Sequence, residues 1–414
     1  MEMTHTKLNT EWPVRPIGEL LRRVRQPVDV QLGQTYQEIG IRSHCKGIFH
    51  KPPTTGEEIG NKRVFWVEPG CLIFNIIFAW EQAVAMTSEN EAGMIASHRF
   101  PMYTSRNGKL LPEYAWRYFS SPRGKYDLGI ASPGGAGRNK TLGQAEFDQL
   151  KIPVPPLSHQ RMAVDTLAAA DRAIALTEDL IEAKRKLKEG LAKLLLTGKH
   201  RLPDCKAQWC ERSISDLAEV NPRTAKPPFL DTQVSFVPMA NISEGGGLIS
   251  PPVRPYRDVA SGFTAFQDGD VLVSKITPCF ENQKGALAQD LSNGYGFGTT
   301  ELHVLRAKAS CSARFLFYVS MSEGFRARGV ANMTGSAGQR RVPTGFIQSY
   351  RLRVPSLPEQ ERIANVLSMA DRRVKLLQTK LTALREIKRG LMQRLFADST
   401  SEVRLARGED RNAA

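Results

Sequence analysis

The chain has 414 residues, which is more than one hydrophobic core usually supports, so its length predicts several domains. Lysine and arginine number 57 against 42 acidic residues, and the resulting net charge of +15 favours an anionic partner, most commonly nucleic acid. A hydrophobic content of 41% excludes global disorder, and no apolar run is long enough to span a membrane.

The cysteines and the start of the chain predict a cytoplasmic protein. Six cysteines are scattered along the sequence, as reduced thiols are, and not as a disulfide framework. The first residues contain no apolar signal core. Cys205 and Cys210 lie near His200, but no second pair of ligands follows, so we expect no metal site.

Residues 1–155 predict a globular module with a largely β core. Short β-rich runs such as "CLIFNIIFAW" (71–80) alternate with clusters of Gly, Pro and Asn, and a short helix is expected at "EYAWRYFSS" (113–121). The loop "GGAGRNK" (134–140) combines flexible glycines with cations, which suits phosphate and base contacts. The DNA contacts expected in this module are Asn75, Arg138, Asn139 and Lys140.

Residues 156–200 predict a long helix that begins just after a pair of prolines, where a missing N–H costs least. Its apolar residues follow an approximate heptad repeat, which indicates a narrow seam that packs against another helix. The residues of this seam are Ala163, Leu167, Ala170, Ile174, Ile181, Leu187, Leu191 and Leu195.

Residues 201–355 predict a second module of the same kind, with β-rich runs "DVLVSKI" (270–276) and "LHVLRA" (302–307). The loop "GSAGQRR" (335–341) repeats the glycines and cations of "GGAGRNK". One such loop alone is an ordinary solvated turn, but its recurrence at equivalent places favours DNA contact. The contacts expected here are Lys275, Thr277, Lys284, Gln339, Arg340 and Arg341.

Residues 356–398 predict a second long helix, followed by a disordered tail over 399–414. The seam runs through Ile363, Leu367, Ala370, Val374, Leu377, Leu381 and Leu384, and continues at Ile387, Leu391 and Leu395. "PPLSHQRMAV" at residue 155 and "PSLPEQERIA" at residue 355 start matching, ungapped segments, so the chain is a tandem duplication. The simplest arrangement pairs the two helices antiparallel; the alternative is that each docks on its own module.

No catalytic motif is present in full. The stretch Lys226-Pro-Pro-Phe229 has a lysine where an amino-methyltransferase needs an amide or carboxylate acceptor. There is no Gly-x4-Gly-Lys-Ser/Thr loop for a nucleotide, and the glycines of "GYGFG" (294–298) have the wrong spacing for a cofactor loop. The sequence therefore predicts a non-catalytic protein of α+β class, with two largely β modules and two long antiparallel coiled-coil helices.

Over its whole length the chain resembles the specificity subunit of type I restriction–modification systems. The motif "PSLPEQERI", continued by "ADRRVKLLQTKLTALREIKRGLMQRLF", is similar to the helical spacers of that family. "GDVLVSKITPCFENQKGAL" and "GFGTTELHVLRA" resemble one class of its target-recognition domains. The first module, with "FAWEQAVAM", resembles a different class, and Ser158-His159 departs from the spacer motif.

The resemblance implies a non-catalytic subunit that selects the DNA site. Each module would read one half of a bipartite, asymmetric double-stranded DNA site, and the helices would set the gap between the halves. Two methyltransferase subunits would dock along the spacers, and motor-nuclease subunits would join them. S-adenosylmethionine, ATP and Mg²⁺ would then belong to these partners, and this chain would bind no cofactor. The residues assigned to docking are Gln160, Asp171, Arg172, Gln360, Asp371 and Arg372.

Two other classes of function stay open at this stage. One is a catalytic methyltransferase or nuclease, against which the missing motifs argue. The other is a coiled-coil scaffold that binds proteins or anionic surfaces without reading a base sequence. Competition between duplexes separates the second from the specificity subunit, because a scaffold would bind all duplexes alike.

Overall fold

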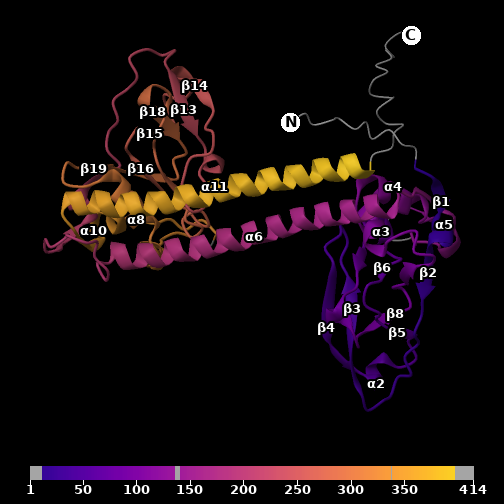
Figure 1. Ribbon diagram of the computed structural model, residues 1–414. Helices are drawn as coiled ribbons and strands as arrows, with labels where there is room; N and C mark the ends of the chain where they lie inside the picture. The colour runs from indigo at the N-terminus through magenta and orange to yellow at the C-terminus, as the bar shows by residue number, and fades with distance from the viewer. Residues whose placement is uncertain (1–11, 136–139, 337, 397–414) are drawn as a thin grey trace, which may run out of the picture. The chain divides into compact units, whose positions relative to one another are not determined.

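The computed structural model describes residues 12–135, 140–336 and 338–396, so the predicted tail over 399–414 lies outside the described residues. The chain divides into two compact units. The first unit comprises Met1–Thr177 and Lys380–Ala414, and the second comprises Glu178–Thr379. Each unit therefore holds one globular module together with a segment of each long helix (Figure 1).

The first module is built mainly of short strands. Its strands are β1 (Val14–Pro16), β2 (Leu21–Val24), β3 (Thr35–Ile41), β4 (Ile48–Thr55), β5 (Val64–Trp66), β6 (Leu72–Phe74), β7 (Val84–Met86), β8 (Ile95–Ser97), β9 (Met102–Ser105) and β10 (Lys151–Pro153). Its helices are α1 (Ile17–Leu20), α2 (Gly56–Ile59), α3 (Pro112–Phe119), α4 (Pro122–Ile130) and α5 (Gln144–Gln149). The strands form two four-stranded sheets, β2-β9-β6-β7 and β4-β3-β8-β5, and β1 pairs with β10.

The second module repeats this arrangement. Its strands are β11 (Cys210–Ser213), β12 (Ala218–Val220), β13 (Gln233–Val237), β14 (Val253–Pro255), β15 (Thr264–Gln267), β16 (Val271–Ser274), β17 (Gly285–Leu287), β18 (Tyr295–Gly298), β19 (Leu302–Ala307) and β20 (Arg351–Val354). Its helices are α7 (Ile214–Leu217), α8 (Ala313–Met321), α9 (Glu323–Ala331) and α10 (Thr344–Ser349). The sheets are β12-β19-β16-β17 and β14-β13-β18-β15, and β11 pairs with β20.

The two modules share one topology. Each strand of the second module corresponds to the strand of the first whose label is smaller by ten, and the order within every sheet is the same. The one parallel pairing also recurs, between β3 and β8 and between β13 and β18. The duplication in the sequence therefore extends to the strand order, and positions in one module can be compared with their equivalents in the other.

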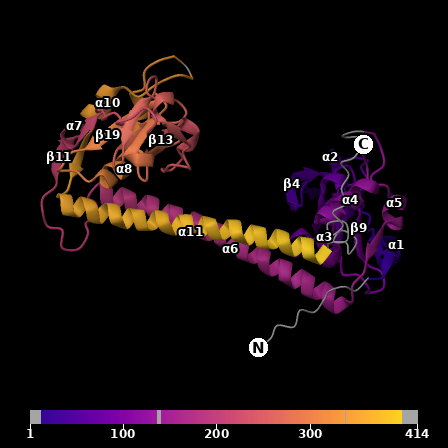
Figure 2. The same cartoon turned by 90° about the horizontal axis from the view of Figure 1, so that it is seen from above.

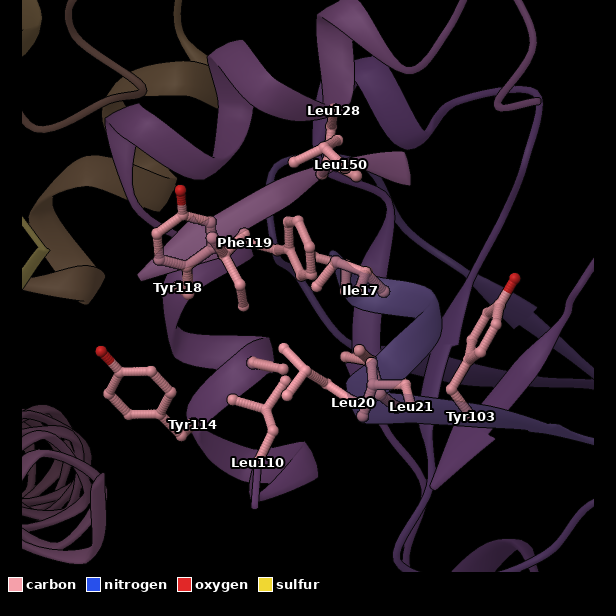
Figure 3. Close-up of a cluster of buried hydrophobic side chains, with 14 of the residues drawn as sticks. Ile17, Leu20, Leu21, Tyr103, Leu110, Tyr114, Tyr118, Phe119, Leu128 and Leu150 are labelled. Carbon is pink, nitrogen blue, oxygen red and sulfur yellow. The ribbon is translucent and has the colours of Figure 1, made fainter. Parts of the chain in front are cut away.

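The largest core of each unit joins the module to both long helices, α6 (Leu157–Leu196) and α11 (Leu357–Phe396). In the first unit, Phe396 at the end of α11 packs against Tyr114 and Tyr118, with ring centroids 5.4 and 6.0 Å apart. Figure 3 shows these tyrosines in the cluster that also contains Ile17 and Leu20. Each large apolar side chain buried in this way contributes about 1.5–3 kcal/mol to folding.

The helices α6 and α11 each contain 40 residues. Within each unit their segments lie side by side and run in opposite directions (Figures 1 and 2). Asp171 of α6 pairs with Lys388 of α11 in the first unit, and Lys188 of α6 pairs with Asp371 of α11 in the second, with N–O distances of 2.6 and 2.5 Å. Both pairs have the same antiparallel register, so the predicted antiparallel pairing is confirmed.

One part of the predicted seam is wrong. Leu187 and Ile387, expected in the seam, are 54% and 56% exposed. The next residues, Lys188 and Lys388, turn inward instead and reach the aspartates of the opposite helix. The sequence pattern favoured leucine and isoleucine because they are apolar. Steps of three and then four residues lead from Ile181 to Lys188 and from Leu381 to Lys388. Their aliphatic stems can pack in the seam while the ammonium groups find carboxylates.

One buried glutamine near the start of each long helix fixes that helix to the module that precedes it in the chain. Gln160 has no exposed surface; its amide donates to the carbonyls of Lys109 and Pro155, and its oxygen accepts the Leu111 N–H. Gln360 makes the equivalent contacts in the second unit. Its partners are the carbonyls of Ser310 and Pro355 and the N–H of Ser312. A buried carboxamide with all of these bonds satisfied strongly specifies one orientation of helix and module.

Asp171 connects three elements of the first unit. Its carboxylate accepts hydrogen bonds from Lys388 of α11 and from Arg117 of α3. Burial raises the pKa of Asp171, but the hydrogen bonds from Lys388 and Arg117 more than offset this effect, so the net shift of its pKa is downward. The ionised carboxylate therefore stabilises the folded state at neutral pH, and this contribution is lost as the pH falls through the lowered pKa.

We predict that Asp171→Asn lowers the free energy of unfolding at pH 7 by about 1–2 kcal/mol, the value of charged hydrogen bonds reduced for a side chain that is one-third exposed. The difference from the wild type should shrink as the pH falls below ~4, because the carboxylate is protonated first in the unfolded chain and then, at its lowered pKa, in the folded one. Urea unfolding at several pH values measures both. Asp165→Asn, on an exposed position of the same helix, is the control. An equal loss at pH 3 and pH 7 would contradict the ionic role.

Candidate nucleic-acid interface

Each module has a loop that follows an inner strand of its first sheet, β6 in the first module and β16 in the second. The first target loop, residues 75–83, connects β6 to β7, and the second target loop, residues 275–284, connects β16 to β17. These loops contain four of the expected DNA contacts, which are Asn75, Lys275, Thr277 and Lys284. The glycine-rich loops over 132–143 and 332–343 precede α5 and α10 and supply the others.

In the second module the two loops meet. The N–H of Thr277 donates to the carbonyl of Arg340 at 3.0 Å, and the N–H of Val342 donates to the carbonyl of Lys275 at 2.8 Å. Ile276 forms a β-bridge with Arg341. Backbone bonds of this kind hold two irregular loops in one surface. The structure therefore brings Lys275 and Thr277 together with Arg340 and Arg341, although Thr277 and Arg340 lie more than 60 positions apart in the sequence.

The two arginines of this surface differ in whether a carboxylate is paired with them. Arg340 and Gln339 are exposed. Arg341 instead forms a bidentate salt bridge with Glu301, with N–O distances of 2.9 and 2.8 Å. The hydrogen bond from Arg341 lowers the pKa of Glu301 and raises that of Arg341 itself, so this pair stays ionised at neutral pH. The sequence does not indicate Glu301, because no local motif marks an acidic residue beside a distant strand as the partner of a loop arginine.

Thr277 and Lys284 are only partly exposed and have partners within the chain. The Thr277 hydroxyl donates to Glu281 at 2.7 Å, and the Lys284 ammonium donates to the carbonyl of Met239 at 3.2 Å. Both bonds shape the second target loop. A DNA contact by either side chain stays a prediction.

In the first module the equivalent loops also converge. The N–H of Leu142 donates to the carbonyl of Ile76 at 2.9 Å, and the Lys140 ammonium lies 5.7 Å from the centre of the Trp80 ring. Asn75 is only 9% exposed, and its side-chain oxygen accepts the N–H of Ile77, which defines a tight turn. Its contact with a base therefore stays a prediction. Arg138 and Asn139 lie outside the described residues.

A cavity of about 460 Å³ opens beside Lys140, lined by Trp80, Tyr126, Ile130 and Lys125 among others. Its two lysines, Lys125 and Lys140, carry positive charge that suits contact with a phosphate backbone. Trp80 was not predicted as a site residue, although a tryptophan next to a predicted DNA-contact loop is a signal that the sequence does offer.

The six residues predicted to dock partners fall into three pairs. Gln160 and Gln360 are buried within their units, so the structure gives them an internal role and leaves docking a prediction. Asp171 and Asp371 are partly exposed and paired with lysines. Arg172 and Arg372 are exposed and can meet a partner. No cluster of residues that could hold a metal ion is found in the described part of the chain, and none of its helices is both long and apolar enough to cross a membrane.

The two-module topology and the paired loops are those expected of a protein that reads DNA at two places. The family described as "Type I restriction modification DNA specificity domain" matches residues 75–184 and 206–386 of this chain. The chain therefore belongs to this family, and the resemblance seen in the sequence is confirmed.

Two relatives from Escherichia coli are similar in sequence over part of their length. The chain is 39% identical over 189 residues to the specificity subunit of type I restriction enzyme EcoAI, which covers 44% of this chain and 31% of that protein. It is 38% identical over 162 residues to the specificity subunit of type I restriction enzyme EcoEI, covering 39% and 27% respectively. The matches thus span about a third or less of the relatives' own length.

Solved structures are similar over nearly the whole chain. The HsdS subunit from Thermoanaerobacter tengcongensis matches with a TM-score of 0.51 and 17% identity, covering 96% of this chain and 99% of that structure. The S subunit of a type I restriction–modification system from M. genitalium matches with a TM-score of 0.56 and 12% identity, covering 95% and 98%. At these identities the likeness shows the fold: two sheet-rich modules and two long helices.

The different environments of Arg340 and Arg341 generate a prediction about salt. Arg340→Ala should weaken duplex binding and lower the slope of log affinity against log salt by about one, because one free cation is lost. Glu301→Gln should strengthen binding and steepen the slope by about one, because Arg341 is released. Gln339→Ala, in the same loop but uncharged, should leave the slope unchanged. Fluorescence anisotropy across a salt series measures all three, and a flat response to Arg340→Ala would exclude this surface.

Proposed function

We propose that this protein is the sequence-specific DNA-recognition subunit of a type I restriction–modification complex. The observation that carries the proposal is the repeated site: in two modules of identical topology, the target loop and the glycine-rich loop are joined by equivalent backbone hydrogen bonds. A duplicated surface with cations suits two contacts with one DNA duplex. Membership of the family supports the same function.

The two half-sites are expected to differ. The first module presents Trp80 and Lys140, and the second presents Lys275 and Arg340 at the corresponding loops. Base edges are read by the donors and acceptors of individual side chains, so different side chains on one scaffold select different bases. The target is therefore bipartite and asymmetric, with an unread gap between its halves.

The protein acts through partners in this proposal. Two methyltransferase subunits dock along α6 and α11, and motor-nuclease subunits complete the restriction enzyme. The assembled complex is a DNA adenine methyltransferase and a site-specific endonuclease, while this chain is non-catalytic. S-adenosylmethionine, ATP and Mg²⁺ are bound by the partner subunits, and the complex works in the cytoplasm. The absence of a complete catalytic motif from the sequence agrees with this division of labour.

The proposal predicts that modification requires both this chain and its methyltransferase. The two genes should be expressed together in a host without other adenine methylation, and the modified sites should be read by methylation sequencing. We expect a bipartite target with two unlike halves, and no methyl transfer by the purified chain alone.

Three outcomes would overturn the proposal. Methyl transfer by the chain alone would make it an enzyme. The same sites modified without the chain would remove its role in selection. Equal binding of all duplexes in competition would make it a scaffold, because a scaffold does not read bases.

A further inference from the structure

Arg326 of α9 is a buried cation in the second module. It is 4% exposed, and burial lowers the pKa of its guanidinium to about 9. Among the described residues no carboxylate pairs with it. Its nitrogens donate instead to the carbonyls of Ser320 at 2.8 Å, Phe280 at 3.0 Å and Lys284 at 3.4 Å, and its guanidinium lies 4.5 Å from the centre of the Phe280 ring.

Placing a guanidinium in this interior is costly. A buried charge without a counter-ion loses its hydration, and several carbonyl dipoles and an aromatic face only partly replace the water. An apolar residue of similar size would fill the same space without this cost. The arginine instead provides a geometric constraint. Its planar guanidinium donates to three separate carbonyls in fixed directions, and a lysine ammonium cannot reproduce this arrangement.

The carbonyls that Arg326 contacts join two parts of the module. Phe280 and Lys284 lie in the second target loop, and Ser320 lies near the end of α8. The loop itself has no regular structure over most of its length. Its conformation is held at both ends. Backbone bonds to the glycine-rich loop hold Lys275 and Thr277, and Arg326 holds Phe280 and Lys284.

The surroundings leave little freedom at this point. A Cβ on Gly329 would come within 2.3 Å of the Phe280 ring, and a Cβ on Gly285 would come within 3.1 Å of an Arg326 nitrogen. The loop is therefore seated against α9 at a fixed distance, with the guanidinium between them.

The first module makes the same connection with a different residue. Gln82, in the first target loop, donates its amide to the carbonyls of Phe119 at 2.9 Å and Ser121 at 3.2 Å. Phe119 and Ser320 are equivalent positions, because each precedes by two residues the serine whose side chain caps the next helix. Gln82 belongs to the target loop and Arg326 belongs to the helix α9. Both nevertheless donate to the carbonyl at this equivalent position.

We propose that Gln82 and Arg326 are positioning residues that fix the two target loops for base reading, each for its own half-site. The inference rests on the proposed function. Neither side chain need touch DNA: each holds the loop that does. Because Gln82 lies in the first unit and Arg326 in the second, and the two have no partner in common, each connection can be removed separately.

The experiment uses the full chain in complex with its methyltransferase. Once methylation sequencing has given the wild-type target, three duplexes are compared: the intact target, one with the first half scrambled and one with the second half scrambled. Gln82→Leu and Arg326→Met remove the donors at nearly constant size. Each variant should lose discrimination at one half only, by about tenfold or more, the value of one lost base contact. The two variants should affect opposite halves.

Controls separate positioning from folding and from charge. The salt slope of Arg326→Met should stay at the wild-type value, because the guanidinium is buried and meets no phosphate. Arg326→Lys keeps the charge but loses the fork, so it should behave like Arg326→Met. If Arg326→Met fails to fold, the partly exposed Gln82 decides the question through Gln82→Leu.

Unchanged discrimination in a folded variant, or an equal loss at both halves, would overturn the inference. A wild-type complex that shows no bipartite target would instead overturn the proposed function, so the two failures are distinguishable.

Discussion

The ion pair between an aspartate of one long helix and a lysine of the other occurs once in each unit, in the same register. Asp171 meets Lys388 and Asp371 meets Lys188. Each aspartate also contacts its module, through Arg117 in the first unit and through the Tyr318 hydroxyl in the second. A single carboxylate thus holds a module, its own helix and the opposite helix together. A half-buried charge with two donors tolerates few alternative registers, which is the best-attested role of polar groups in helix seams.

This constraint explains how irregular loops can form the DNA-reading surface that we propose. The target loops have little regular structure. The bonds of Gln82 and Arg326 connect them to the helices of their modules, and backbone bonds connect them to the glycine-rich loops. The modules are in turn fixed to the helices by Gln160 and Gln360. Function placed on loops of a rigid scaffold can change while the scaffold stays the same. The two modules show this directly: one topology carries two different sets of side chains.

Much of this architecture could be predicted from the sequence. The long helices follow from their heptads and flanking prolines, and the duplication follows from the ungapped match after Pro155 and Pro355. The error at Leu187 and Ile387 arose because periodicity ranks apolar residues above lysines, whereas the fold supplies carboxylates opposite Lys188 and Lys388. The preference for lysine at these positions comes from the carboxylates of the opposite helix. A pattern within one helix carries no information about them.

The site was less predictable for the same reason. Arg341 and Arg340 are adjacent and equally basic, but only the first meets Glu301, which lies 40 residues away. Arg326 is one of many arginines in the sequence, and only the packing of α8, α9 and the second target loop shows that it is buried. Pairings across the chain decide which charges are free, and these pairings come from tertiary structure.

We propose that the two modules read two half-sites and that the length of the paired helices sets the gap between these half-sites. Inserting four residues into both helices, after Thr177 and after Thr379, leaves each Asp–Lys pair intact within its unit. It should move the modules apart by roughly 6 Å and rotate them by about 40°, which matches one or two base pairs of DNA. Methylation sequencing of cells with this variant and its methyltransferase should show both half-sites unchanged and a gap longer by one or two base pairs. An unchanged gap, or a change in the bases read, would contradict the account.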